Sequence, residues 1–152
     1  MKIYYSYNKK EREGFVTKHP EEILLEEEGS VEEISGEDVL EKIPNLPLFF
    51  KECYRLLRPG GTAVFTSAYY NSYQAWADPR NIRGISQCSL NFASKVWREQ
   101  NKCEDLADCN FDVAINFAVD RRASERSDVA KEFWLSFYSN VVQSVLFTLT
   151  KV

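Results

Sequence analysis

The sequence predicts an α/β fold built on a mostly parallel sheet, and two segments carry this prediction. Residues 46–67 read as an amphipathic helix, a Gly-Gly turn and an apolar strand, which together form half of a βαβ unit. Residues 111–152 read as a strand, a helix and a second strand. The chain has 152 residues, enough for one hydrophobic core, and shows no repeat or linker. We therefore expect a single domain over residues 1–152.

Three short strands are expected before the central helix. Residues 2–7 alternate weakly between polar and apolar side chains, residues 14–16 begin a second strand, and residues 31–35 are typical of a third. Residues 21–33 are dominated by glutamate around the apolar residues 23–25. We interpret this acidic segment as a solvated loop with a short buried strand at residues 23–25, and an acidic docking surface is the alternative.

The central helix is expected to begin at Leu46, after a short helical turn over residues 38–43. Its last turn holds Arg55 and Arg58, where cations interact favourably with the helix dipole. Its apolar face repeats at helical spacing and comprises Leu46, Phe49, Phe50, Cys53, Tyr54 and Leu57. The Gly-Gly pair that follows permits positive φ angles. Residues 62–67 are apolar and rich in strand-forming residues, which predicts a strand covered on both faces.

A long polar and aromatic loop, residues 68–86, follows that strand directly. Ligands of open α/β sheets bind beyond the carboxyl ends of the strands, so this loop is a candidate binding segment. Its candidate binding residues are Tyr70, Trp76, Asp78, Arg80, Asn81 and Arg83. Two interpretations stay open. Arg80 or Arg83 of a substrate lid could grip an anion, or Trp76 in the core and an Asp78–arginine ion pair could pin a structural loop.

The C-terminal third is expected to contain further helices and strands. The pattern predicts a helix over residues 90–100, a half-buried strand over residues 111–119 and a closing strand over residues 145–152. Ser127 is the predicted cap of a helix that lies between the last two strands. The side chains of that helix expected in the core or on a packing surface are Val129, Phe133, Trp134, Phe137, Tyr138 and Val141, of which Trp134 and Tyr138 are also candidates for a partner interface.

Charge and composition exclude several classes of function. The net charge of −4 argues against general nucleic-acid binding through phosphate neutralisation. No apolar run approaches the roughly 20 residues of a membrane span, and the N-terminus lacks the apolar core of a signal peptide, so we expect a cytoplasmic protein. The four cysteines form no CxxC pair, and the single histidine is His19. This composition predicts neither a metal site nor a disulfide framework.

Three motifs point to a known family. They are SVEEISGEDVLEKIPN, RLLRPGGTAVFTS and YNSYQAWADPRNIR, and they occur in this order. With them the chain resembles the small class I S-adenosylmethionine-dependent methyltransferases, and the resemblance continues through FWLSFYSNVV and LFTLTKV. It implies a Rossmann-like sheet, reduced and mostly parallel, with an antiparallel C-terminal strand. It also implies S-adenosylmethionine as the cofactor if the chain is active.

The chain departs from this family at the positions that bind the cofactor. The first loop of the family is glycine-rich because its backbone approaches the cofactor closely, whereas Ser6, Tyr7 and Asn8 stand here. His19 stands where the family has an acidic residue that accepts hydrogen bonds from the ribose hydroxyls. The positions that the resemblance assigns to the cofactor are therefore Ser6, Tyr7, Asn8, His19, Gly36 and Asp38, which we regard as degenerate.

The chain also lacks family histidines and some length. Asp38 and Lys42 replace two histidines of the family motif, and Asn81 replaces the histidine of the long loop, so the expected general bases are missing. Only 16 residues separate Gly14 from Val31, so the region that frames the adenine in the family is expected to be trimmed.

Two functions from different classes remain open at this point. The first is a methyltransferase-like protein that has lost efficient S-adenosylmethionine binding and serves as a binding or accessory module, with a protein partner or a second copy of itself. The second is an active, divergent methyltransferase, in which positioning of a ready nucleophile would suffice for methyl transfer. The catalytic residues and the methyl acceptor are unknown under either hypothesis.

Overall fold

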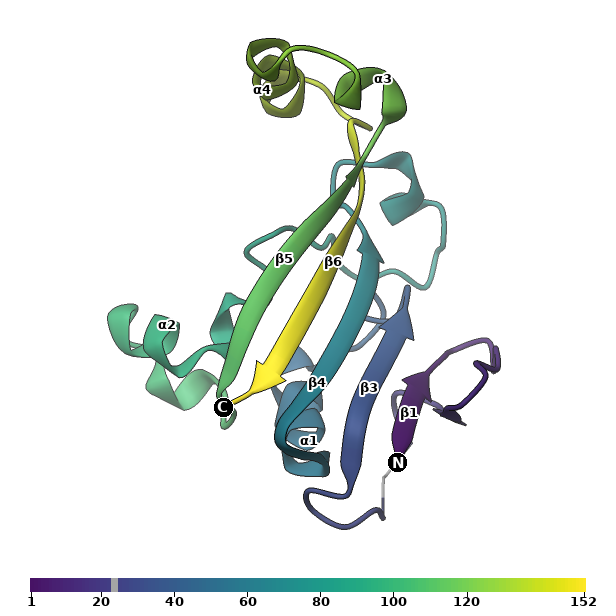
Figure 1. The fold of residues 1–152 in the computed structure, drawn as a ribbon, viewed down its shortest axis with the longest axis vertical. Helices are drawn as coiled ribbons and strands as arrows, with labels where there is room; N and C mark the ends of the chain where they lie inside the picture. The colour runs from purple at the N-terminus through teal and green to yellow at the C-terminus, as the bar shows by residue number, and fades with distance from the viewer. Residues whose placement is uncertain (23–24) are drawn as a thin grey trace.

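The computed structural model describes residues 1–22 and 25–152, and its centre is a six-stranded mixed sheet (Figure 1). The strand order is β2-β1-β3-β4-β6-β5. The strands are β1 (Lys2–Tyr5), β2 (Val16–Lys18), β3 (Val31–Glu37), β4 (Leu57–Ala68), β5 (Phe111–Val119) and β6 (Val142–Lys151). The first four strands pair in parallel, and β6 is antiparallel to both β4 and β5. The predicted Rossmann-like arrangement is confirmed.

The α-helices are α1 (Leu46–Leu56), α2 (Lys95–Gln100), α3 (Arg121–Ser124) and α4 (Asp128–Phe137), and the 3-10 helices are η1 (Tyr73–Trp76), η2 (Asn91–Ala93) and η3 (Glu104–Leu106). Asn45 caps α1 by accepting a hydrogen bond from the backbone N–H of Leu48, and Pro47 suits the first turn. The helix predicted over residues 90–100 is divided into η2 and α2, because Ser94 is extended and caps α2.

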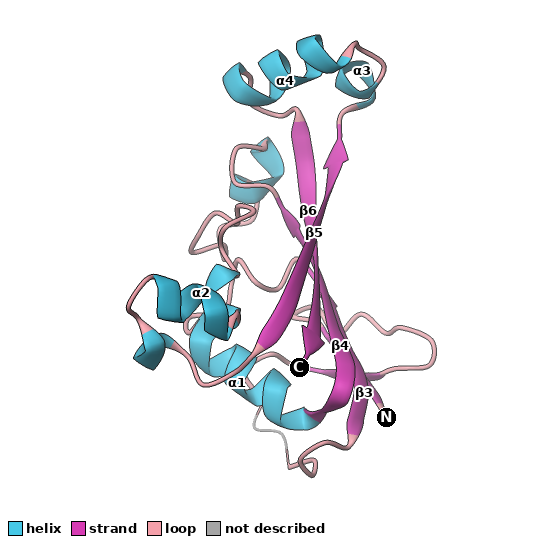
Figure 2. Cartoon of the chain, turned by 60° about the vertical axis from the view of Figure 1, so that its left-hand side comes forward, coloured by secondary structure: helices cyan, strands magenta, loops and turns pink. Residues whose placement is uncertain are grey.

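One face of the sheet carries the core, as Figure 2 shows for α1 and α2. The centre of this core is an aromatic cluster: Phe50 lies fully buried among the rings of Phe49, Phe65, Phe92 and Phe111, with ring centroids 5.4–6.2 Å away. Cys53 of α1 is fully buried beside them, as predicted. The apolar periodicity of α1 is therefore explained by burial against the sheet, through ring contacts with β1, β4 and β5.

The opposite face of the sheet is open in the described part of the chain, where neither α1 nor α2 covers it (Figure 2). The expectation that residues 62–67 would be covered on both faces is wrong: Ala63, Phe65 and Ser67 are buried, whereas Thr62, Val64 and Thr66 are only partly buried. Threonine and other small polar residues suit a strand face that meets water. Near β1 the loop between β1 and β2 touches this face, since Arg12 donates to the hydroxyl of Ser35.

The Gly-Gly pair, Gly60 and Gly61, lies inside β4, because this strand follows α1 directly. The helix ends at Leu56, so Arg58 belongs to β4 and not to the last helical turn. Leu57 pairs with Val31 and Thr62 with Glu33, which leaves an outward bulge between the two pairs. Gly60 in this bulge has a φ of 74°, a value that side chains with a Cβ adopt rarely.

Two predictions about buried segments fail. The strand expected at residues 23–25 falls partly outside the described residues, and Leu25, the part that is described, is 92% exposed and belongs to no strand. The helix capped by Ser127 forms as α4, but it ends at Phe137 and none of its residues is buried. Val141, which lies beyond its end, is buried as expected. Figure 1 shows why: α3 and α4 lie beyond the ends of β5 and β6, away from the sheet. The large exposed side chains of this helix and its end are Val129, Phe133, Leu135, Phe137 and Tyr138.

Among the described residues, no helix combines the length and apolar character that crossing a membrane requires. In the same residues, no group of three or more histidine, cysteine or acidic side chains is placed to hold a metal ion.

Candidate functional site

The carboxyl ends of β1, β3 and β4 meet at one edge of the sheet, and two of the cavities at this edge are lined by residues that the sequence predicts for the site. The first, of about 250 Å³, is lined by Tyr4, Ser6, Tyr7, Asn8, Lys10, Glu37, Asp38, Lys42, Asp78 and Arg80, and we call it the inner cavity. The second, of about 530 Å³, is lined by Asp38, Glu41, Lys42, Ala68, Gln74, Ala77, Asp78, Pro79 and Asn81, and we call it the loop cavity. The fold therefore brings the first loop and residues 68–86 together, although they are distant in sequence.

The three residues of the first loop that depart from the glycine-rich pattern of the family each have a defined partner. The hydroxyl of Ser6 accepts a hydrogen bond of 3.0 Å from the backbone N–H of Lys10. The ring of Tyr7 stands edge-on to the ring of His19, with centroids 4.8 Å apart. Burial raises the pKa of Tyr7 to about 12, so its hydroxyl is protonated at neutral pH. Asn8 accepts a hydrogen bond of 3.1 Å from the guanidinium of Arg80.

His19 lies directly after β2, where the resemblance places it, and it is half-buried. Its Nδ1 accepts a hydrogen bond of 3.3 Å from the backbone N–H of Glu21. The backbone N–H of His19 in turn donates to the carboxylate of Glu22 at 3.3 Å. The imidazole is thus engaged with its own turn and with Tyr7.

Arg80 and Lys42 hold the long loop through Asp78. Arg80 donates hydrogen bonds to both carboxylate oxygens of Asp78, at 3.0 Å and 2.7 Å. These hydrogen bonds, helped by the nearby Lys42 ammonium at 3.5 Å, keep the pKa of Asp78 well below its ordinary value. The Lys42 ammonium is almost fully buried and also donates to the backbone carbonyl of Asp38 at 2.7 Å. The predicted Asp78–arginine ion pair is therefore present.

The other loop residues do not converge on a ligand position. Trp76 is 63% exposed, so the expectation that it pins the loop from the core is wrong. Its indole N–H donates to the backbone carbonyl of Tyr70, a residue that is also exposed. Asn81 donates to the carbonyl of Ala75 at 2.9 Å. Arg83 donates to the carbonyl of Pro44, which ties the loop to the start of α1.

Gly36 and Asp38 are needed by the fold at this edge. A Cβ added to Gly36 would lie 2.8 Å from the side chain of Val39 and 3.1 Å from the ring of Phe65. Asp38 is exposed, with a φ of 52° that marks the turn out of β3. We expect Gly36→Ala to lower the free energy of unfolding by about 1–3 kcal/mol, because the extra methyl group overpacks the core. Chemical denaturation measures this, and an unchanged midpoint would contradict it.

Glu41 is the residue of this site whose environment could not be read from the sequence. Its side chain is 1% exposed, and one carboxylate oxygen accepts a hydrogen bond of 2.9 Å from the backbone N–H of Ala68, at the end of β4. The other oxygen is buried and has no hydrogen-bond partner in the described structure. Burial raises the pKa of Glu41. Its position four residues after β3 in an apolar turn was the only signal, and acidic residues in such turns are usually solvated.

Comparison with known proteins finds the same fold in methyltransferases. Residues 4–65, from β1 into β4, match the methyltransferase domain family. Among solved structures, an S-adenosylmethionine-dependent methyltransferase from Archaeoglobus fulgidus is 15% identical with a TM-score of 0.57, and the match covers 83% of this chain. The chain has the class I methyltransferase fold. This fold confirms the resemblance to class I methyltransferases that the three sequence motifs indicate.

Two further structures share this methyltransferase fold. The YcgJ protein from Bacillus subtilis is 12% identical with a TM-score of 0.52, and the match covers 90% of this chain and 70% of that one. A complex between the Haloferax volcanii Trm112 methyltransferase activator and a methyltransferase contains a chain that is 17% identical, with a TM-score of 0.51 and coverage of 90% and 60%. The present chain spans 62% of the Archaeoglobus protein. No curated protein sequence matches it.

Proposed function

We propose that this methyltransferase-fold protein has lost efficient S-adenosylmethionine binding and acts as a binding or accessory module in the cytoplasm. The observation that carries the proposal is the state of the inner cavity. Tyr7 and His19 pack ring against ring where the family has a small residue and an acid, and Arg80 bridges from the long loop to Asn8. The inner cavity has about 250 Å³, and it adjoins the loop cavity, with which it shares Asp38, Lys42 and Asp78.

The chemistry of the lining supports the same conclusion. A ribose needs an acceptor at the end of β2, but the acceptor nitrogen of His19 is already bonded to the backbone of Glu21. The cofactor also needs close approach to the backbone of the first loop, and the side chains of Ser6 and Asn8 occupy that approach with their own hydrogen bonds. The residues present therefore do not fit the cofactor, and no methyl-transfer step is derived through them.

An accessory role needs a surface for a partner, and α4 supports this part of the proposal. Phe133 is 53% exposed and Phe137 is 73% exposed, and their rings pack against each other 4.9 Å apart. Trp134 contacts Tyr138 and lies beneath the guanidinium of Arg126. Aromatic and arginine side chains of this kind are enriched where proteins bind each other. A related fold occurs in a complex with a methyltransferase activator, and this supports a role in which the chain binds another protein.

Calorimetric titration with S-adenosylhomocysteine tests the loss of cofactor binding. We expect no saturable heat and no thermal shift at ligand concentrations up to about 1 mM, which corresponds to less than about 4 kcal/mol of binding free energy. The variant Arg80→Ala removes the side chain that bridges to Asn8, and Lys131→Ala on α4 is the matched control. Micromolar binding by the unmodified chain would refute the proposal, whether or not Arg80→Ala binds more tightly.

An active, divergent methyltransferase is the second candidate, and the loop cavity is the observation that favours it. This cavity has about 530 Å³, lies at the carboxyl end of β4 and is partly lined by a buried carboxyl group, that of Glu41. Turnover of S-adenosylmethionine to S-adenosylhomocysteine in the presence of a methyl acceptor would establish this second function.

A further inference from the structure

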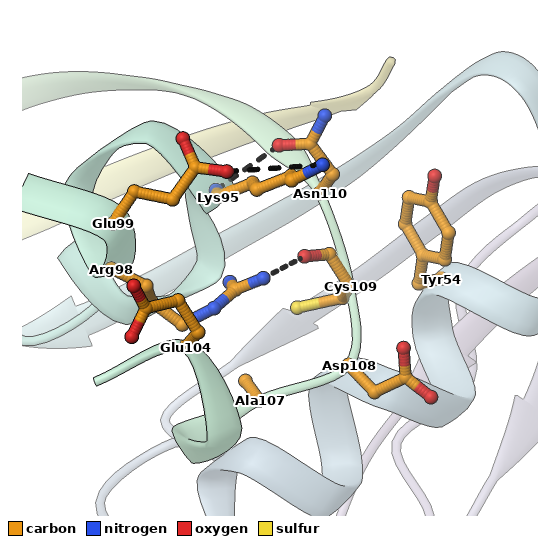
Figure 3. A pocket seen from close by; sticks show the side chains of 9 residues that line it. All are labelled: Tyr54, Lys95, Arg98, Glu99, Glu104, Ala107, Asp108, Cys109 and Asn110. Atoms are coloured by element: carbon orange, nitrogen blue, oxygen red, sulfur yellow. Dashed lines mark hydrogen bonds and ion pairs between the residues drawn. The ribbon is translucent and has the colours of Figure 1, made fainter. Parts of the chain in front are cut away.

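A third cavity lies away from the sheet edge described above and shares no residue with its two cavities. It has about 430 Å³ and is lined by Tyr54, Lys95, Arg98, Glu99, Glu104, Ala107, Asp108, Cys109 and Asn110. We call it the Arg98 pocket. Figure 3 shows that its walls come from α2, the following turn and the segment before β5, with Tyr54 of α1 at one side. The guanidinium of Arg98 extends across the pocket toward Cys109 (Figure 3).

Arg98 is a buried cation whose hydrogen bonds all go to neutral groups. The residue is 5% exposed. Its two terminal nitrogens donate to the backbone carbonyls of Phe92 and Cys109, at 2.6 Å and 2.8 Å. Its Nε–H is buried and has no partner, and no carboxylate of the described residues forms an ion pair with it. Because a guanidinium has five N–H donors, two such bonds leave three donors unused.

The carboxylates around the pocket have other partners or are exposed. Glu99 pairs with Lys95 at 3.8 Å, and Asp108 pairs with Lys51 at 3.1 Å and is 84% exposed. Glu104 is exposed and forms no ion pair among the described residues. Burying a cation without a counter-ion costs several kcal/mol, so proteins pair such groups or give them a bound anion. The Arg98 pocket thus has a buried positive charge and room for a small molecule.

We propose that the Arg98 pocket binds a small oxyanion, a carboxylate or phosphate group, on Arg98 with Lys95 at the rim. The free Nε–H and the remaining hydrogen of a terminal nitrogen form the planar fork that binds two oxygens of an oxyanion at once. Lys95 lies on the same helix, its side chain is 64% exposed, and it supplies a second positive charge. Glu104 also lines the pocket, and its negative charge is expected to oppose binding of the anion.

Two probes at constant ionic strength, inorganic phosphate and acetate, test this site on the full chain. We expect a saturable rise of the thermal midpoint with an apparent Kd of about 1–10 mM for at least one of them. Phosphate binding alone identifies the ligand as a phosphate ester, and acetate binding alone identifies it as a carboxylate. Arg98→Lys keeps the charge but loses the fork, so affinity should fall about tenfold or more.

Arg98 also donates hydrogen bonds to two backbone carbonyls, so a substitution of Arg98 can affect folding as well as binding. Variants at the rim of the pocket test binding without this complication. Lys95→Gln is expected to weaken binding about threefold, and Glu104→Gln to strengthen it by a similar factor, because each changes one partly screened charge. Lys131→Gln on α4 removes an exposed charge elsewhere and should leave affinity unchanged. Equal, non-saturable shifts in all variants would show a general salt effect and overturn the proposal. So would a Lys95→Gln affinity equal to that of the unmodified chain.

Discussion

Phe50→Ala is expected to lower the free energy of unfolding by about 3–5 kcal/mol, because it leaves a cavity in the aromatic cluster. The ring is fully buried and contacts four other phenylalanine rings from α1, η2, β4 and β5. These neighbours belong to different elements, so they cannot close the space by moving one side chain. Urea denaturation followed by circular dichroism measures the change, and a loss below about 1 kcal/mol would contradict the assignment of this cluster as the core.

Phe137 is the matched control for this prediction. It is also a phenylalanine on a helix, but it is 73% exposed and α4 buries none of its residues. Phe137→Ala should therefore change the free energy of unfolding by less than about 0.5 kcal/mol. The contrast between the two variants separates a helix that builds the core from a helix that is free to contact a partner.

Glu41→Ala is expected to cost about 2–4 kcal/mol, because the backbone N–H of Ala68 loses its acceptor and the buried side chain leaves a void. Glu41→Gln keeps the accepting oxygen and should cost less than about 1 kcal/mol. Glu37→Ala, next to the same turn but with an exposed carboxylate, should unfold like the unmodified chain. Equal stability of Glu41→Ala and Glu37→Ala would show that the turn does not depend on this carboxyl group.

The stability of the chain should also depend on pH through Glu41. Burial raises the pKa of Glu41 in the folded state above the ordinary value of 4.5. The folded state then binds the proton more tightly than the unfolded chain, so this contribution is complete below pH 4.5 and is lost as the pH rises through the folded pKa. Relative to Glu41→Gln, the unmodified chain should lose stability with rising pH, as denaturation at several pH values would show. Parallel pH profiles would refute this.

The sheet could be predicted from the sequence because its strands and α1 follow local rules. Apolar periodicity located α1, strict alternation located β5, and the asparagine before Leu46 and the serine before Asp128 became the caps of their helices. The arrangement of the tail could not be predicted. The apolar stripe of α4 is typical of a core helix. Whether such a helix is buried depends on the direction in which the chain leaves β5 and enters β6, and periodicity does not encode this direction.

The candidate site was predictable in position but not in its contacts. Motif order placed Ser6, Tyr7, Asn8 and His19 at the carboxyl edge of the sheet, and they lie there. The pairing of Lys42 with Asp78 joins residues 36 positions apart, and no local pattern marks it. The burial of Arg98 was not predicted for the same reason, because an arginine within a short helix is usually solvated. Its burial follows from the folding of residues 92–109 around it.

The strand order has a further consequence at the two edges of the sheet. The edge strand β2 has three residues, whereas β5 at the other edge has nine, and β5 pairs only with β6 in the described sheet. A long strand with one unpaired side is a template for another strand, so addition of a foreign or identical strand is expected at β5. Asp112 and Asn116 are exposed on this strand, and polar side chains on an edge strand are expected to limit repeated addition of strands.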